Sequence, residues 1–573
     1  WFMKQKAIVP GYLFDYEKLK DILKDLSDKE STYYKAILQN LFFATLNTKQ
    51  DERRFREERR FYKGYNPDFG NQYVYRYHDL FKDSEKIKEY FGDIPFLNGG
   101  LFECFDDGKN NIYIDGFTER SSNYQPKVPN FLFFSDEQTV DLSSDYGEAR
   151  YRKAKVRGLI EILKSYNFTI DENTPVDEEV ALDPELLGKV FENLLASYNP
   201  ETATTARKAT GSYYTPREIV DYMVDESLKA YFKNNLPGID ENKLNQLFSY
   251  DGEENPFDTE TTNRLIHAIH KLKIIDPAVG SGAFPMGILH KLVHILHKLD
   301  PRNELWKEEQ IRAVEQSVTD PKLKQELIEK IEESFTLNEL DYGRKLYLIQ
   351  NCIYGVDIQP IAIQIAKLRF FISLLVDEKV DKTKPNWGIE PLPNLETKFV
   401  AANTLIPLPQ EPYICPKMDE IILLEKELFV LRKRHFTTFN VEAKKAILEK
   451  DAEIRKKIKT LIDGYVAENK NKLERLKQKL KNLPVDYREV IEETVIEKKK
   501  VKKDINEQKR IDLNSQIEKL EKNLNADDLL LEKYHKIAEF NIYNTNTSAD
   551  WFDPEWMFGV TDGFDIVIGN PPY

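Results

Sequence analysis

The sequence has too few cysteines for a disulfide framework or a cysteine-based metal centre. Its 573 residues include three, Cys104, Cys352 and Cys415, and they lie far apart. No pair has the close spacing typical of zinc ligands, so neither a disulfide scaffold nor a zinc site is expected. Such sparse cysteine is typical of proteins kept in a reducing cytoplasm, which is the predicted location.

Histidine and long apolar runs are also limited. His290, His294 and His297 have helical spacing, but no carboxylate completes a ligand set there and no His-Glu-x-x-His motif occurs, so no metal is expected. No apolar run approaches the roughly 20 residues of a membrane span, and no signal peptide is evident. We therefore expect no membrane partner.

The remaining composition is that of a large globular protein. Hydrophobic residues make up 41% of the chain and charged residues 31%, and the length predicts more than one domain. The net charge of −14 argues weakly against a nucleic-acid partner, but a basic groove can lie on an acidic protein.

Four regions are predicted along the chain. They are a mainly helical N-terminal region (1–180), the first part of an α/β core (181–415), a charged helical or coiled-coil insertion (416–540) and the resumed core (541–573). Because the chain begins at Trp1 and ends directly after an apolar strand, we expect it to be a fragment of a longer protein.

Strands that alternate with helices define the core. A strand at Leu272–Ile275 leads through a Gly-rich turn to a helix at Pro285–Leu299, and a strand at Ile353–Val356 leads to a helix at Ile361–Leu375. This alternation predicts a doubly wound parallel sheet.

The insertion shows two apolar helical stripes. Leucines recur at 3-4-3 spacing over 473–483, and Leu and Ile recur at 4-3-4 spacing over 513–524. A basic run at 498–503 separates them, so an antiparallel helical hairpin is predicted. An insertion that packs on itself is favoured over a DNA clamp, because charge runs are usually solvated faces.

The Gly-rich turn indicates a ligand site. The sequence DPAVGSGAF at 276–284 joins a strand to a helix, where glycines let the backbone approach a ligand and the helix start offers free N–H groups. The turn lacks the Gly-x-Gly-x-x-Gly pattern of pyrophosphate binders. Asp276 at the strand end favours a cationic or hydroxyl-rich ligand. Asp357, at the end of the second strand, could accept two ribose hydroxyls or could cap the next helix.

The most specific motif is Asn570-Pro571-Pro572-Tyr573, directly after an apolar strand. Prolines make the turn rigid. Such a turn can direct the Asn570 side-chain oxygen and the Pro571 carbonyl at one amino group, while Tyr573 stacks on the ring that carries it. A site of this kind requires a base to leave its duplex. A plain proline turn is the alternative.

Together these motifs resemble those of amino-group DNA methyltransferases. The 276–284 turn is similar to their cofactor motif and Asn570–Tyr573 to their catalytic motif. YYTP at 213–216 resembles the cofactor motif that precedes the turn in the gamma order of that family. Sequences at 97–103 and 183–188 resemble the methylase part of type IIG restriction–modification enzymes and related phage-defence methylases.

The resemblance implies a Rossmann-like, S-adenosylmethionine-dependent fold and assigns residues to it. The catalytic residues would be Asn570, Pro571, Pro572 and Tyr573. The cofactor-binding residues would be Tyr213, Thr215, Pro216, Asp276, Ala278, Gly280, Gly282, Phe284, Asp357, Ile358 and Asn403. Val279 stands where the family often has Cys, which the backbone contacts should tolerate.

One spacing departs from the family. Asp276 and Asp357 are 81 positions apart, against roughly 20 in a compact unit. A charged helical insertion at 303–339 is expected to account for the excess; if it does not, the Asp357 assignment fails.

The implied activity is site-specific methylation of adenine N6 in double-stranded DNA by base flipping, within a restriction–modification or phage-defence system. A target-recognition segment is expected after Tyr573, and any nuclease region upstream of residue 1. Cytosine N4 methylation, methylation of RNA or of protein glutamine, and a non-catalytic DNA-binding scaffold stay open as alternatives. Cytosine C5 chemistry is not expected, because no Pro-Cys pair occurs.

Overall fold

A computed structural model describes residues 1–56, 68, 70–97, 102–106, 113–118, 125–146, 149–166, 215–252, 254–317, 321–337, 340–409, 417–493, 498–544 and 546–571. These form two compact units, residues 1–404 with 545–548 and 554–573, and residues 405–544 with 549–553. Within the described ranges, no helix is both long enough and apolar enough to cross a membrane. The sequence at 183–188 that resembles type IIG methylases lies outside them.

The N-terminal part of the first unit consists of short helices around aromatic side chains. One of these helices is η2 (Tyr33–Thr45). The buried guanidinium of Arg53 donates to four backbone carbonyls, including those of Thr45 and Thr48 at 2.8 and 3.0 Å, and so joins η2 to the next segment. The other elements are α1 (Phe2–Gln5), η1 (Gly11–Phe14), α2 (Tyr16–Ile22), η3 (Gln50–Glu52), η4 (His78–Leu80), η5 (Ser84–Lys86), α3 (Ile87–Phe91), α4 (Phe131–Phe134), β1 (Gln138–Val140), α5 (Ser143–Tyr146), η7 (Ala149–Lys153), β2 (Ala154–Val156) and α6 (Leu159–Lys164).

A parallel four-stranded sheet forms the centre of the first unit. Its order is β5-β4-β3-β8, with β3 (Ile274–Asp276) between β4 (Ile353–Asp357) and β8 (Ile566–Val567), and β5 (Phe399–Ala401) beyond β4. The surrounding elements are α9 (Arg217–Asn235), α10 (Glu241–Phe248), α11 (Thr259–Lys271), α12 (Ala283–Leu299), α13 (Glu304–Ser317), α14 (Pro321–Leu337), α15 (Leu340–Asn351), α16 (Pro360–Val376), η9 (Pro385–Gly388) and α20 (Pro554–Phe558).

The structure confirms the predicted α/β class and the parallel direction of the sheet. All of β3 and β5 and the first four residues of β4 are buried, as expected for strands with neighbours on both faces. The first strand begins later than predicted, because α11 continues to Lys271 and Leu272 forms its buried C-cap.

Helices α13 and α14 occupy the stretch expected to be an insertion. They follow α12, and α15 then leads into β4. Despite the long separation in sequence, Asp276 pairs in register with Gly355, two residues before Asp357. The inserted helices therefore explain the large spacing without separating the two strand ends.

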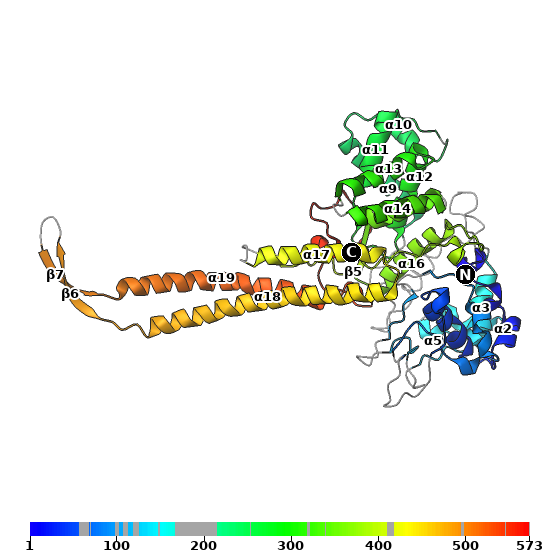
Figure 1. The fold of residues 1–573 in the computed structure, drawn as a ribbon, viewed down its shortest axis with the longest axis horizontal. Coiled ribbons are helices and arrows are strands. Elements are labelled where there is room, and N and C mark those ends of the chain that lie inside the picture. The colour runs from blue at the N-terminus through cyan, green and yellow to red at the C-terminus, as the bar shows by residue number, and fades with distance from the viewer. Residues whose placement is uncertain are drawn as a thin grey trace. The chain divides into compact units, whose positions relative to one another are not determined.

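Helix α9 packs closely against α12. A Cβ atom at Gly287 of α12 would lie 2.9 Å from the Val220 side chain of α9. Both helices are labelled in Figure 1. This close approach brings the start of α9, where Thr215 and Pro216 lie, near the turn before α12.

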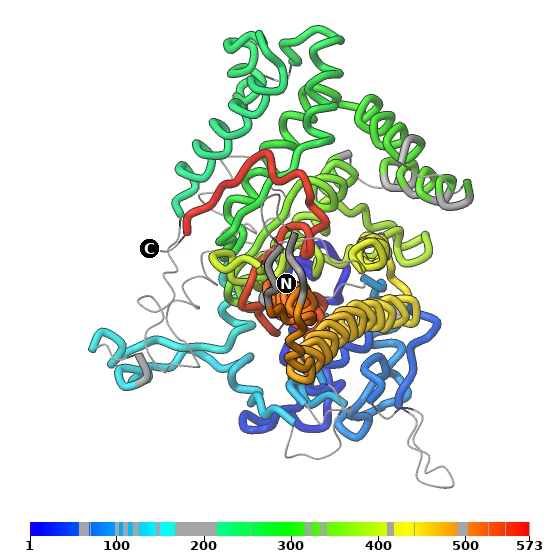
Figure 2. Tube along the Cα trace, turned by 90° about the vertical axis from the view of Figure 1, so that its left-hand side faces the viewer, coloured from blue at the N-terminus to red at the C-terminus, as the bar shows by residue number. Residues whose placement is uncertain are grey.

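The second unit is dominated by two long helices. These are α18 (Val441–Lys481) and α19 (Glu507–Glu539), preceded by α17 (Met418–Phe436) and joined by the hairpin of β6 (Tyr487–Glu493) and β7 (Lys498–Asp504). The long helices lie side by side, with the hairpin at their far end (Figure 1 and Figure 2). We call α18, β6, β7 and α19 the coiled-coil arm.

The arm is antiparallel in a single register. Four side-chain contacts between the helices all join residues whose numbers add to 998: the ion pairs Lys459–Glu539, Lys470–Asp528 and Lys477–Glu521, and the contact of Asp463 with the His535 ring. The seam between the helices is apolar and includes the buried Ile458 and Ile462. The leucine stripe predicted to reach Leu483 is shorter in the structure, because α18 ends at Lys481, before Pro484.

Candidate functional site

The carboxyl ends of the four parallel strands bring polar residues from distant parts of the chain to one edge of the sheet. Asp276 ends β3, Asp357 ends β4, Asn403 follows β5 by two residues and Asn570 follows β8 by three. In open parallel sheets this edge is where ligands bind. We call it the carboxyl edge.

The turn after β3 is held by backbone hydrogen bonds to β4. The Val279 N–H donates to the Val356 carbonyl at 2.8 Å, and the Gly280 N–H donates to Asp357 Oδ2 at 2.9 Å. Gly280 and Gly282 have φ values of 51° and 88°, which glycine adopts without strain. Gly282 is the N-cap of α12, so the first amide groups of a 17-residue helix open onto the turn.

Asp276 is the most unusual group at the carboxyl edge. It is 1% exposed; its Oδ1 accepts from the Ala278 N–H at 3.0 Å, but its Oδ2 has no hydrogen-bond partner in the described structure. Burial, together with the nearby Asp357 carboxylate, raises the pKa of Asp276 to about 8. A cation or a hydrogen-bond donor placed here would satisfy Oδ2.

Gly569, the residue before Asn570, allows the backbone to approach the carboxyl group of Asp276. A Cβ atom at Gly569 would lie 2.4 Å from Asp276 Oδ1. Since Asp276 is buried and held by Ala278, it has little room to move aside. The sequence interpretation did not single out Gly569, although its position directly before Asn570 was the available signal.

Asp357 orders the loops on both sides of it. Its Oδ1 accepts from the Gln359 N–H at 2.8 Å, while its Oδ2 holds Gly280. Burial raises the pKa of Asp357, and these two backbone bonds partly oppose that rise. Each oxygen keeps a further lone pair for a ligand hydroxyl. The next residue, Ile358, is 59% exposed and offers an apolar surface beside the carboxylate.

Asn570 meets a residue from the other end of the core. Its Nδ2 donates to Thr215 Oγ1 at 3.1 Å, across 355 positions of sequence. Thr215 is 9% exposed and precedes Pro216, the N-cap of α9, whereas Asn570 and Pro571 are exposed. With Nδ2 engaged, Oδ1 of Asn570 is the atom left to accept a hydrogen bond from a substrate.

The other expected site residues vary in their placement. Phe284 is 3% exposed in the first turn of α12, so its ring packs behind the turn, while Ala278 is half-buried. Asn403 is half-buried, and the neighbouring Thr404, which the sequence interpretation missed, donates from Oγ1 to the Pro277 carbonyl at 3.1 Å. Tyr213, Pro572 and Tyr573 lie outside the described residues.

The histidines of α12 have protein partners. The ring of His294 lies 3.0 Å from the Ser249 carbonyl and contacts Tyr250, and burial lowers the pKa of His294 to about 4. The His297 ring lies 3.4 Å from Arg344. These contacts account for the helical spacing of these two histidines through packing.

Three potential metal ligands also converge in the N-terminal part, which the sequence did not indicate. Side-chain atoms of Cys104, Asp106 and Asp115 lie within 4.8 Å of one another. The Asp106 carboxylate, however, accepts three backbone N–H groups and the Thr118 hydroxyl. This role is structural, since it holds the backbone of residues 115–118.

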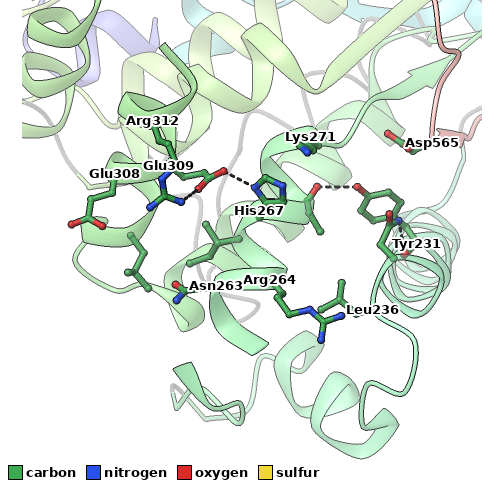
Figure 3. A pocket seen from close by; sticks show the side chains of 14 residues that line it. Tyr231, Leu236, Asn263, Arg264, His267, Lys271, Glu308, Glu309, Arg312 and Asp565 are labelled. Atoms are coloured by element: carbon green, nitrogen blue, oxygen red, sulfur yellow. Dashed lines mark hydrogen bonds and ion pairs between the residues drawn. The ribbon is translucent and has the colours of Figure 1, made fainter. Parts of the chain in front are cut away.

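A cavity of about 600 Å³ lies at the opposite, amino edge of the sheet (Figure 3). Asp565 in its lining accepts the Lys273 N–H just before β3. Glu309 of α13 contacts His267 of α11 at 2.6 Å and Arg312 of its own helix at 2.8 Å. None of the residues expected from the motifs lines this cavity, whereas the carboxyl edge brings several of them together around the unsatisfied Oδ2 of Asp276, so the carboxyl edge is the better candidate for a reactive site.

Comparisons with known proteins show what the chain is similar to. Residues 351–573, which contain β4, Asp357 and Asn570, match the family model of the Eco57I restriction-modification methylase. The whole chain is 27% identical, over 614 aligned residues, to a protein of Methanocaldococcus jannaschii named "Putative type II restriction enzyme and methyltransferase RM.MjaORFECS2P". The chain spans 40% of that relative's length. The resemblance to restriction–modification methylases drawn from the sequence motifs is therefore confirmed.

Proposed function

We propose that this chain is the methyltransferase part of a restriction–modification enzyme and transfers a methyl group from S-adenosylmethionine to the N6 amino group of adenine in DNA. The observation that carries the proposal is the carboxyl edge, where an unsatisfied buried carboxylate, a glycine turn and Asn570 converge. The family match over residues 351–573 supports the reaction class, and the name of the relative supports DNA as substrate.

The residues present fit the proposed cofactor. Oδ2 of Asp276 suits a cationic or N–H-bearing group, and the turn over Gly280 and Gly282 has no side chains to obstruct a ligand. Asp357 could accept ribose hydroxyls, and the exposed Ile358 would offer an apolar surface to the cofactor beside them. Ala278, Phe284, Asn403, Tyr213, Thr215 and Pro216 are proposed as further cofactor-binding residues. When bound, S-adenosylmethionine supplies a sulfonium-activated methyl group.

The proposed catalytic role of Asn570 follows from its hydrogen bonding. Its Oδ1 and the Pro571 carbonyl would accept the two N–H groups of the target amine, which positions the nitrogen lone pair for in-line attack. Pro572 would keep the turn rigid, and Tyr573 would stack on a base flipped out of the duplex. A carboxamide and a carbonyl suffice for this chemistry, so no covalent nucleophile is needed.

Thr215 is proposed to position Asn570. A carboxamide can rotate to exchange its oxygen and nitrogen, and only one orientation presents an acceptor to the substrate. The bond from Nδ2 to Thr215 favours that orientation. Thr215→Val should lower kcat about tenfold or more, at the scale of general positioning effects, with little change in KM for DNA. Thr215→Ser should restore kcat, which a purely packing role of the methyl group would not allow.

The decisive experiment is methyl transfer from labelled S-adenosylmethionine to mixed DNA by the full-length protein, with nucleoside analysis of the product. Asn570→Ala should reduce turnover about 10²–10³-fold, the usual effect of losing one preorganised polar contact to a transition state. Calorimetry should show that it still binds the cofactor. Asn242→Ala, an exposed asparagine on α10, is the matched control.

The product separates the proposal from its alternatives. N6-methyladenine supports it, whereas N4-methylcytosine would retain the catalytic roles and change the target. Label in RNA or protein and none in DNA would refute DNA as substrate. Cofactor binding without transfer to any of the three would favour the scaffold hypothesis.

A further inference from the structure

The basic run that stands out in the arm sequence is partly offset in the fold. Strand β7, which contains Lys498–Lys503, pairs with the acidic strand β6. The antiparallel register sets Glu493 opposite Lys498, Glu492 opposite Lys499 and Glu489 opposite Lys502. Lys500 and Lys503 lie opposite Ile491 and Arg488, so glutamates offset only part of the run. The two strands together contain six Lys or Arg and four Asp or Glu.

A larger excess of positive charge lies in the last turns of α18. Residues 441–469 contain seven Lys or Arg and six Asp or Glu, whereas residues 470–481 contain six Lys or Arg and only Glu474 as an acid. All six of these basic side chains are exposed. The whole chain has a net charge of −14, so this segment is a local exception.

The six cations fall on two flanks of the leucine seam. At 100° per residue, Lys470, Lys477 and Lys481 lie on one flank, and Lys472, Arg475 and Lys479 on the other. On the first flank, Lys470 and Lys477 are ion-paired to Asp528 and Glu521 of α19. On the second flank, which we call the basic flank, no ion pair is found for the three cations among the described residues.

The neighbours of the basic flank are amides. Asn471, Gln478 and Asn482 have positions beside it and are exposed, while Glu474 falls on the far side of the helix. Cations interleaved with amide donors are the side chains that contact phosphate oxygens in protein–DNA complexes. A membrane surface would require an apolar face beside the cations, and the leucines are committed to the seam.

We infer that the basic flank binds the phosphate backbone of duplex DNA without reading its sequence. Lys472 to Lys479 span about 10 Å along the helix, which covers about three successive phosphates of one strand. The packed seam keeps the cations on one face, so their spacing is fixed before binding. The choice of DNA as partner rests on the proposed function; the phosphate-binding surface itself rests on the arm alone.

The test is binding of a fluorescent mixed-sequence duplex to the full-length protein over a range of salt concentrations. One variant combines Lys472→Gln, Arg475→Gln and Lys479→Gln. Its matched control combines Lys470→Gln, Lys477→Gln and Lys481→Gln, which removes the same charge from the same turns. Thermal melting and circular dichroism confirm that both are folded, and the three single substitutions of the basic flank provide a second series.

The basic-flank variant should bind about tenfold or more weakly, and its slope of log affinity against log salt should fall by about 0.9 for each lost phosphate contact, or about 2.7 in all. The control should remain close to the parent. Equal loss in both variants, or no loss in the first, would overturn the inference. So would competition by single-stranded RNA and not by duplex DNA.

The DNA-binding test and the methylation assay can fail independently of each other. If the parent methylates no DNA but the basic flank is still required for duplex binding, the proposed reaction fails and the inference holds. If methylation occurs and the variant retains both the parent's KM for DNA and its binding affinity, the reaction holds and the inference fails.

Discussion

The carboxyl edge and the coiled-coil arm both carry polar residues, but those of the carboxyl edge include a buried carboxyl group, whereas the cations of the arm are exposed to water. At the carboxyl edge, Asp276 is 1% exposed and its Oδ2 has no hydrogen-bond partner among the described residues. A small shift of a neighbouring atom would therefore change the hydrogen bonding and the pKa of this carboxyl group. On the arm, Lys472, Arg475 and Lys479 are exposed, and water screens each of them. A buried polar group thus depends strongly on its immediate contacts. An exposed cation contributes little to ligand binding by itself, and several such cations must act together.

The two regions also use glycine differently. Gly569 at the edge faces Asp276, with no space for a side chain, while Gly464 in α18 has no atom within 4 Å of an added Cβ. The same substitution should therefore have opposite effects in the two places, and this contrast provides the first and last of the following predictions.

Gly569→Ala should have the largest effect. Its Cβ would meet the buried Asp276 carboxylate at 2.4 Å, so β8 and the Asn570 turn must shift. A displacement of about 1 Å at reacting groups can cost about 10²-fold in rate. Methyl-transfer assays and cofactor calorimetry measure the loss; activity at the level of the parent would show that the carboxyl edge tolerates movement.

Ile462→Ala should be the largest perturbation of the arm. Ile462 is fully buried in the seam, and such truncations cost about 2–5 kcal/mol. Hydrogen exchange should rise in α18 and α19, while cofactor binding at the carboxyl edge is retained. Equal loss of protection in β3 and β4 would show that the two units unfold together.

Asp276→Asn should alter the pH dependence of stability. Because folding raises the pKa of Asp276 from its ordinary value near 3.8 to about 8, this group favours the folded state at low pH. That contribution is lost as pH rises from about 4 through about 8. The melting temperature of the parent without cofactor should thus fall across this range relative to Asp276→Asn, in which the neutral amide does not titrate.

The same pKa predicts how the parent binds its proposed cofactor. A cationic ligand favours the ionised carboxylate, so affinity should increase as pH rises toward 8, and Asp276→Asn should remove this increase. Calorimetry across the pH range measures both. Identical profiles for the two proteins would show that Asp276 does not face the ligand.

Gly464→Ala should have the smallest effect, and it should stabilise. Alanine is about 0.5–1 kcal/mol more favourable than glycine inside a helix, and the site is open. A small rise in the melting temperature of the arm, with unchanged methyl transfer, is expected. A loss of stability would mean that another surface packs against α18 at this point.

Much of the carboxyl edge could be predicted from sequence because its chemistry is local. The strand, turn and helix around Asp276 occupy adjacent residues, and glycine and proline restrict the backbone wherever they occur. The helices α12 and α16 and the strand β4 lie close to the predicted positions for the same reason. The predicted roles of Tyr213, Pro572 and Tyr573, which lie outside the described residues, stay predictions.

Other properties depend on contacts between residues far apart in the chain. The bond from Asn570 to Thr215, the fit of Gly569 against Asp276 and the pKa of that buried group exist only once the sheet has formed. On the arm, the sequence drew attention to the run at Lys498–Lys503, but strand pairing sets glutamates opposite much of it and the helical register leaves Lys472, Arg475 and Lys479 without ion pairs among the described residues. Sequence by itself determined which residues could carry chemistry or charge. Tertiary structure decided which of them are buried, oriented or neutralised, because those properties depend on neighbours that only folding supplies.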